Sequence, residues 1–192
     1  MARPTAPRGA ARGRVLEAAL ALFAEHGVHG TSLQMIADRI GVSKAAVYYQ
    51  FHSKEDIALE VIRPSMEDAA RVIRIAEALP DPRQRRAVAV SGLVEMAVRN
   101  RQLAVMFYKD PAIDQLVLND ADLKAISVGL RELLDGPDPD VAHRVASSVF
   151  FAGIGKAATD PELADVEDAE LRGALLDVSG RILAPLEEPA AG

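Results

Sequence analysis

The chain has 192 residues, no cysteine and a formal net charge of −6 at pH 7. Its length suits one medium domain or a small domain joined to a larger one, and without cysteine it cannot form disulfides, thiolate metal sites or cysteine nucleophiles. The charge is divided unevenly: residues 1–54 hold seven Lys/Arg and three Asp/Glu, whereas residues 55–192 hold fifteen and twenty-five. Because salt screens exposed charges within about 8–10 Å, the locally basic first part favours nucleic-acid binding.

The first residues are rich in Arg, Pro and Gly, and we expect residues 1–12 to form a flexible basic arm. Two interpretations of the arm stay open: a solubilising tail, or an extension that reaches DNA phosphates or the minor groove. The arginines concerned are Arg3, Arg8, Arg12 and Arg14. Helical spacing of apolar residues then predicts a helix with Val15, Leu16, Ala19, Leu22 and Phe23 on one face and Gly27 at its end.

Acidic residues interrupt the apolar run of this first helix. Glu17 and Glu25 disfavour a signal peptide, and no stretch of about eighteen uninterrupted apolar residues occurs in the sequence. We therefore expect a cytoplasmic protein without a membrane partner.

Residues 31–54 carry the pattern of a helix-turn-helix, beginning with a short amphipathic helix. Apolar residues at spacings of three and four predict a helix over 33–40. Thr31 or Ser32 is expected to cap its start, and Gln34 follows Thr31 at the spacing of a capping box.

A tight turn is expected after this helix. Gly41 supplies the left-handed conformation that ends many helices, Val42 is expected to be a buried anchor, and Ser43 to cap the next helix. Such a turn sets two helices at the angle of a DNA-binding motif.

The second helix, residues 44–51, is the informative one. Val47 and Phe51 are one turn apart and are expected to point inward. Tyr48 and Tyr49 are adjacent, so they cannot both be buried on one face of so short a helix. We expect a helix that enters the DNA major groove with its first residues.

These residues resemble the DNA-binding domain of the TetR family of repressors. The resemblance rests on Gly41-Val42-Ser43-Lys44 followed by Val47-Tyr48-Tyr49-x-Phe51-x-Ser53-Lys54, and extends back to Leu22–Gly27 and Ile36–Asp38. It covers roughly the first sixty residues and implies an all-α fold of about nine helices. In this fold a helix-turn-helix head (1–54) sits on a larger helical body (55–192) that dimerises and binds a ligand.

The resemblance also implies roles for residues of the head. Lys44, Ala45 and Ala46 would approach base edges, and four others would position the head on phosphates, with Thr31 and Ser32 nearby. Those four are Tyr48, Tyr49, Gln50 and Lys54. Tyr48 touching a thymine methyl is an alternative. Because two alanines offer no side-chain donors, shape readout or the arginine arm is expected to contribute to specificity.

The fourth helix begins after Ser53 and carries two unusual residues. Lys54 places a cation in the first turn, where the helix dipole disfavours it, so either a bound phosphate accounts for it or it is a solvated surface lysine. Pro64 interrupts the helix interior. It is either a bend that transmits changes from the body to the head or a proline tolerated at a helix break.

Four Asp-Pro pairs divide the body, because Asp at the N-cap followed by Pro at the first position marks helix starts. They predict helices near 82–100, 102–109, 111–135, 139–158 and 162–184. No segment alternates with period two, so no strand is expected.

The last two helices carry apolar stripes. One stripe is Val141, Val145, Val149 and Ala152, followed by small residues, and the other is Leu171, Leu175, Val178 and Ile182. An intrachain core and a helix-bundle dimer explain the stripes equally well. In the TetR family the last two helices of two subunits build a four-helix dimer interface, so the resemblance favours a homodimer.

A ligand pocket is expected between helices of the body, where apolar sites are common. The body holds only four aromatic residues, in adjacent pairs whose directions diverge by about 100°, so one of each pair is expected to face a cavity. The candidate pocket residues are Met66, Met96, Phe107, Tyr108, Phe150 and Phe151, with Met106 as further lining. The family commonly binds an inducer there, so an unknown small-molecule ligand is implied.

No motif for catalysis, metal binding or a cofactor is present. The four histidines, His26, His29, His52 and His143, match no metal-ligand spacing, and phosphate-binding loops and nucleophile elbows are missing. We expect a non-enzymatic, ligand-responsive repressor that binds a palindromic operator as a homodimer. The alternatives are a small-molecule-binding helical protein without DNA binding, and an enzyme with an appended helix-turn-helix.

Overall fold

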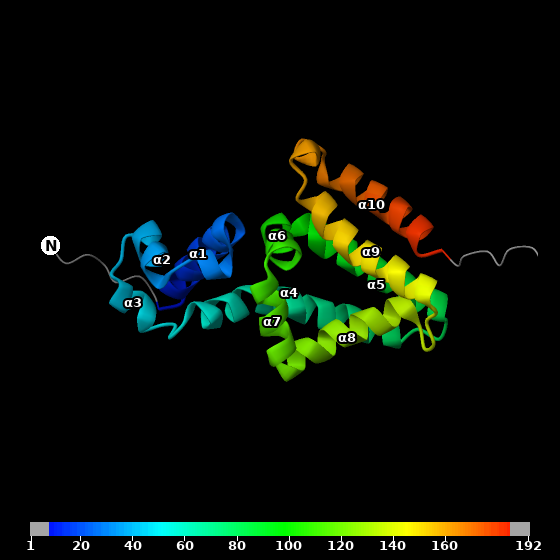
Figure 1. Ribbon diagram of the computed structural model, residues 1–192, viewed down its shortest axis with the longest axis horizontal. Coiled ribbons are helices and arrows are strands. Elements are labelled where there is room, and N and C mark those ends of the chain that lie inside the picture. Colours follow the sequence, from blue (N-terminus) through cyan, green and yellow to red (C-terminus); the bar gives the residue numbers. More distant parts are fainter. Residues whose placement is uncertain (1–7, 185–192) are drawn as a thin grey trace, which may run out of the picture.

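A computed structural model describes residues 8–184 of the chain. Every regular element among the described residues is a helix, and the molecule is elongated with a small head at one end (Figure 1). The head contains α1 (Arg8–Gly30), α2 (Leu33–Ile40) and α3 (Lys44–Tyr48). The long helix α4 (Lys54–Glu77) runs from the head into the body (Figure 1).

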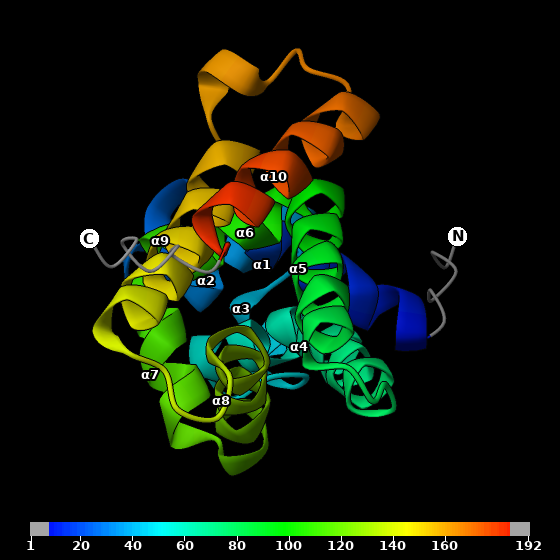
Figure 2. The same cartoon turned by 90° about the vertical axis from the view of Figure 1, so that its right-hand side faces the viewer.

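The body contains the remaining helices, with α9 and α10 together on one side and α7 and α8 on the other (Figure 2). They are α5 (Pro82–Arg99), α6 (Arg101–Lys109), α7 (Pro111–Asn119), α8 (Ala121–Asp135), α9 (Val141–Ala158), a single 3-10 turn η1 (Pro161–Leu163) and α10 (Asp168–Ile182). No helix of the described part has the length and apolarity needed to cross a membrane.

Two core clusters hold the molecule together. The first joins the head helices to the start of α4 and continues into α6, α7 and the beginning of α8, with Val15, Phe23, Ile57 and Ile113 among its most buried members. The second lies among α4, α5, α8, α9 and α10. Because the first cluster extends from the head into the body, the packing is continuous across residue 54.

The start of α1 differs from the expected arm. The helix begins at Arg8, so residues 8–12 are helical, whereas residues 1–7, including Arg3, lie outside the described part. Gly9 and Gly13 have low helix propensity, so contacts from Arg12 and Arg14 to other helices, described below, are what hold this turn. Gly27 has φ 72° and ψ 166°, which breaks the helix where the sequence predicted its end.

The Asp-Pro rule located the starts of three body elements but missed the helix starts after Asp120 and Asp140. Asp81, Asp110 and Asp160 each accept a backbone hydrogen bond at the start of an element with Pro in its first turn. The expected helix 139–158 begins instead at Val141, because the carboxylate of Asp140 accepts a hydrogen bond from the His143 N–H. That hydrogen bond lowers the pKa of Asp140 below its ordinary value.

One predicted helix is divided in two in the structure, so the described residues contain ten α-helices instead of about nine. The expected helix 111–135 breaks at Asp120, whose carboxylate caps α8 by accepting from Asp122 and Leu123. The expected helix 162–184 is only a 3-10 turn at first, and α10 begins at Asp168. Pro64 lies inside α4, which continues from Lys54 to Glu77.

Candidate DNA-binding site

The recognition helix α3 is held by a cap at its start and two buried side chains. Ser43 accepts a hydrogen bond from the Ala46 N–H at 3.2 Å, and Val47 and Phe51 are buried in the head core, as predicted. The remaining residues of the helix, Lys44, Ala45, Ala46 and Tyr48, are exposed. The helix therefore offers one face to the head and the other to solvent.

The turn before α3 is held by the backbone. Gly41 has φ 70°, and the Val42 N–H donates to the Ala37 carbonyl at 3.0 Å, which closes the end of α2. The prediction that Val42 is a buried anchor is wrong, because its side chain is 37% exposed. Main-chain hydrogen bonds take the place of the expected apolar contact.

Two exposed tyrosines lie on this surface. Tyr49 is 84% exposed and Tyr48 is 53% exposed, so both side chains point outward where the sequence required only one. The ring of Tyr48 meets the ring of His52 edge to face at 5.5 Å between centroids. His52 thus belongs to the same exposed surface, although the spacing of the histidines in the sequence was considered only for metal binding.

Ser32 and Gln50 lie at the edges of this surface. Ser32 is the N-cap of α2 and accepts from the Met35 N–H at 3.2 Å. Gln50 is half-buried, and its amide donates to the Ala46 carbonyl at 3.4 Å. Both side chains make a hydrogen bond within the head, and each retains further donor or acceptor capacity.

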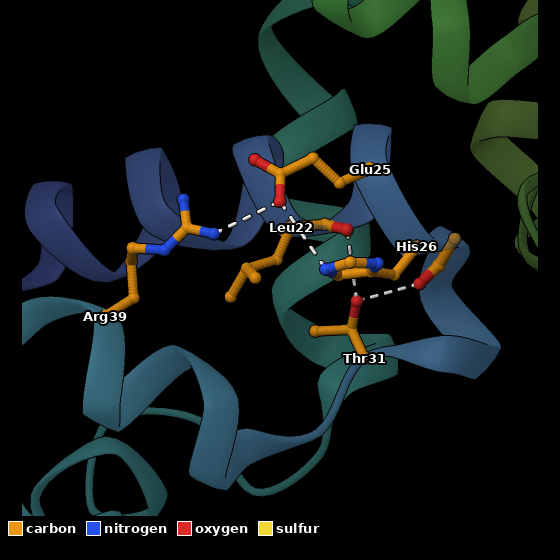
Figure 3. A network of polar contacts seen from close by, with 6 residues as sticks. Leu22, Glu25, His26, Thr31 and Arg39 are labelled. Atoms are coloured by element: carbon orange, nitrogen blue, oxygen red, sulfur yellow. Dashed lines mark hydrogen bonds and ion pairs between the residues drawn. The ribbon is translucent and has the colours of Figure 1, made fainter.

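Thr31 is a different case, and its expected place on the DNA surface is wrong. Its side chain is buried, and its hydroxyl lies 2.8 Å from the Gly27 carbonyl and 3.3 Å from the Leu22 carbonyl (Figure 3). It satisfies acceptors left free where α1 ends. The capping box expected from Thr31 and Gln34 is therefore absent, and Gln34 donates to Asp38 instead.

A polar contact ties α2 to α1 beside this threonine. The carboxylate of Glu25 pairs with Arg39 at 3.2 Å and with His26 at 3.5 Å (Figure 3). All three side chains are about half exposed, so this contact orients α2 more than it stabilises the fold.

Lys54 has intramolecular partners that account for its place in the first turn of α4. Its ammonium donates to the His29 carbonyl at 2.9 Å and to the Thr31 carbonyl at 3.2 Å. Glu55, Asp56 and a Ser53–Asp56 capping box supply the negative charge and caps that this helix start favours. A lysine ammonium has three donors, so one remains available after these two hydrogen bonds.

The contact between head and body at the end of α1 was not foreseen from the sequence. One carboxylate oxygen of Asp110 accepts from the Val28 N–H at 2.5 Å, and the other accepts from the Ala112 N–H at 3.0 Å. Val28 is buried, and the break at Gly27 frees its N–H from the helix. A side chain at the junction of α6 and α7 therefore fixes the end of α1.

The apolar stripes of α9 and α10 could pack within the chain or form a dimer interface, and the structure answers part of this question. Leu171 and Leu175 are buried in the second core cluster, which is the intrachain packing the sequence allowed. Valines on the same two helices nevertheless remain exposed: Val141 is 74% exposed, Val145 56%, Val149 49% and Val178 49%. The intrachain core thus uses only part of each stripe.

Small residues make this exposed face smooth. Ala152, Gly153, Gly173, Ala174 and Gly180 are all exposed. A methyl group added at the three glycines would meet no other atom. Between the two helices runs an apolar groove of about 410 Å³, with walls that include Val149, Ile154, Leu171, Ala174 and Val178.

The expected ligand-pocket residues divide between the two core clusters. Met66 and Phe107 pack in the first cluster, which the body shares with the head. Met96, Phe150 and Phe151 pack in the second, and Tyr108 is 41% exposed. The structure therefore does not bring the six residues together in one pocket.

Two of the aromatic side chains have specific neighbours. Phe150 is buried and lines the groove between α9 and α10, and the guanidinium of Arg131 lies 5.1 Å from the ring centre of Phe151. Among the described residues, no cluster of His, Cys, Asp and Glu is arranged to hold a metal ion.

A helical head of this geometry, with a capped, exposed second helix, defines a helix-turn-helix transcriptional regulator. Comparison with known proteins agrees. Residues 15–61 match the family model described as bacterial regulatory proteins of the tetR family. The chain belongs to the TetR family of DNA-binding transcriptional regulators.

Two relatives illustrate the range of that family. The transcriptional repressor AcnR of Corynebacterium diphtheriae is 27% identical over 177 residues, which cover 81% of this chain and 85% of that protein. The transcriptional activator FasR of Mycolicibacterium smegmatis is 34% identical over 97 residues, which cover 50% of this chain and 44% of that protein.

Solved structures share the fold along nearly the whole chain. The ketosteroid regulator KstR2 of Mycobacterium tuberculosis superposes with a TM-score of 0.69 at 18% identity, covering 93% of this chain and 95% of that one. FadR of Bacillus subtilis, solved with stearoyl-CoA, has a TM-score of 0.59 at 20% identity, covering 91% and 99%. These likenesses establish the all-α fold.

Proposed function

We propose that this regulator is a ligand-responsive repressor that binds a palindromic operator as a homodimer. The observation that carries the proposal is the exposed recognition surface of a locally basic head, with Lys44 at the start of α3 and Tyr48 and Tyr49 after it. AcnR, which aligns over most of both chains, is a repressor, and this supports repression over the activation assigned to FasR.

Each proposed DNA-facing residue has a role set by its chemistry. Lys44, Ala45 and Ala46 meet base edges at the start of α3, and the tyrosines and Lys54 meet the backbone, joined by Ser32, Gln50 and His52. Because alanine offers no hydrogen bond, sequence is read mainly through apolar contacts and DNA shape. Thr31 is not part of this surface, since its side chain is buried.

The two parts of the chain have different proposed roles, which agree with their different charge. Residues 1–54 make the DNA-binding unit, and residues 55–192, which carry most of the acidic side chains, dimerise and bind ligand. A second copy of the chain covers the exposed faces of α9 and α10, placing two heads on half-sites one helical turn or a multiple of it apart.

A body that binds ligand is supported by the FadR neighbour, which holds stearoyl-CoA. In this chain the proposed lining is the group in the second core cluster, Met96, Phe150 and Phe151. Some ligands bind more tightly to the conformation in which the two heads are misplaced for DNA. Such a ligand weakens operator binding, and the loss of binding free energy is limited by its difference in affinity for the two conformations. Stearoyl-CoA is the first probe: we expect it to raise the melting temperature and to weaken operator binding.

DNA binding is tested by its salt dependence. With an operator selected from random duplexes, log affinity should fall steeply with log salt concentration, because bound phosphates release counterions. Lys54→Met should bind more weakly with a slope shallower by about two units, since the free ammonium donor of each subunit in the proposed dimer meets one phosphate.

Lys54→Met needs one control variant and one precaution. Lys124→Met removes an exposed lysine from α8 of the body, and should leave both affinity and slope unchanged. Affinities should be measured well below the melting temperature, because Lys54→Met also loses two hydrogen bonds to carbonyls. A wild-type affinity that does not respond to salt would refute DNA binding by this head.

A further inference from the structure

Arg12 makes three different contacts that join three elements of the head. Its guanidinium lies 4.2 Å from the centre of the Phe51 ring, pairs with Glu60 of α4 at 3.1 Å, and donates to the Gln50 carbonyl at 3.4 Å. A guanidinium suits this place because it is planar: it stacks on a ring with its face while its edge donates hydrogen bonds.

These contacts lie just after the end of the recognition helix, where the chain turns into the core. Gln50 and Phe51 directly follow α3, which is only five residues long and has the C-cap Tyr49. Phe51 is buried at 3% exposure, so Arg12 covers the residue that anchors the end of this helix in the core. Its other partner, Glu60, connects the same point to α4.

Arg14, one half-turn further along α1, holds the preceding helix in the same way. Its guanidinium donates to the Ile40 carbonyl at 2.7 Å, at the end of α2. The first turns of α1 therefore hold the ends of both helices of the helix-turn-helix. Such short helices have little stability of their own, so their orientation depends on contacts of this kind.

We propose that Arg12 is a positioning residue for DNA recognition: it fixes the angle of the recognition helix from inside the head and does not itself contact DNA. This inference rests on the proposed DNA-binding function. It assigns to Arg12 a role different from that of a cation in a basic arm, because its charge is already paired with Glu60 and one of its N–H groups donates to Gln50.

The test compares operator binding by Arg12→Met and Glu60→Gln across a range of salt concentrations. We expect Arg12→Met to weaken binding about tenfold, the scale of one lost charge-assisted hydrogen bond, with the same salt slope as wild type. Glu60→Gln should weaken binding too, because it releases the guanidinium from its place over Phe51.

Glu55→Gln supplies the matched control, since Glu55 also lies on α4 and has no ion pair within the described part of the chain. It reports the effect of removing one negative charge near DNA. All affinities are taken at temperatures where thermal melting shows each variant fully folded, so a loss of stability alone does not reduce binding.

Three results would overturn the proposal. A slope shallower by about two units in Arg12→Met, about one for each subunit, would show lost phosphate contacts. Tighter binding by Glu60→Gln than by Glu55→Gln would show that a freed Arg12 binds DNA. Wild-type affinity in Arg12→Met, with only its melting temperature lowered, would show a purely structural role. The proposed function fails separately, if the wild-type protein itself lacks salt-dependent binding.

Discussion

Val149→Asp is expected to convert the protein from a dimer to a monomer and to weaken operator binding about 100-fold or more, because the two heads no longer bind as one unit. Val149 is 49% exposed in the single chain and lines the apolar groove between α9 and α10. In the proposed dimer a carboxylate there is buried without a partner, which is strongly unfavourable. Sedimentation and operator titration measure the two effects.

Val128→Asp is the matched control for this experiment. Val128 is also an exposed valine, at 46%, but it lies on α8, on the other side of the body from α10 (Figure 2). It should leave the protein dimeric and able to bind its operator. If Val149→Asp stays dimeric, or if the wild-type protein is a monomer at micromolar concentration, the α9–α10 face is not the dimer interface.

The second large effect is expected at the junction of head and body. Asp110→Ala removes the acceptor of the buried Val28 N–H and the N-cap of α7, which together contribute about 3 kcal/mol to the free energy of unfolding. For a chain of this length the melting temperature should fall by roughly 6–12 °C. Operator affinity should also fall, because the end of α1 loses its contact with the body.

Asp120→Ala isolates the contribution of the contact with Val28. Asp120 is also an N-cap aspartate, and both of its hydrogen bonds, to Asp122 and Leu123, stay within its own helix start. Its loss should lower stability by about 1 kcal/mol and leave operator binding unchanged. Equal destabilisation by the two variants would show that the Asp110–Val28 hydrogen bond contributes nothing, and calorimetry together with operator titration distinguishes the outcomes.

Asp110 also suggests how a change in the body reaches the head. Its two carboxylate oxygens bind backbone groups of α1 and α7 at once, so a shift of the α6–α7 corner moves the end of α1. Lys54 holds the carbonyls of His29 and Thr31 only a few residues further on. The segment between α1 and α2 is thus fixed from two sides, so in the proposed ligand response a shift of α6 or α4 acts on the same segment.

The helix-turn-helix was predictable because its signals are local. The caps of Ser32, Ser43 and Ser53, the left-handed Gly41 and the inward spacing of Val47 and Phe51 depend on residues within one or two helical turns, and the structure has each of them. The same reasoning located the starts of α5, α7 and the 3-10 turn η1 from their Asp-Pro pairs.

Local rules failed where two adjacent residues compete for one role. Thr31 and Ser32 are both good caps, and only the packing of α1 shows that Thr31 turns inward to the Gly27 carbonyl. Asp120 and Asp140 cap helices without a following proline, so nothing nearby distinguished them from other surface aspartates. The predicted boundaries at 111–135 and 139–158 were wrong for that reason.

The sequence by itself determined that this chain is all-helical and that residues 31–54 form a helix-turn-helix, since caps and periodicity act over a few residues. The tertiary structure alone decided what the charged side chains do. Arg12, Arg14, Lys54 and Asp110 bind groups between 23 and 82 residues away in the chain. Such partners are set by how the helices pack, which no local pattern encodes. Arg12, Arg14 and Lys54, for which the sequence left a phosphate contact and a plain surface role both open, donate hydrogen bonds to carbonyls of the segments that hold α2 and α3.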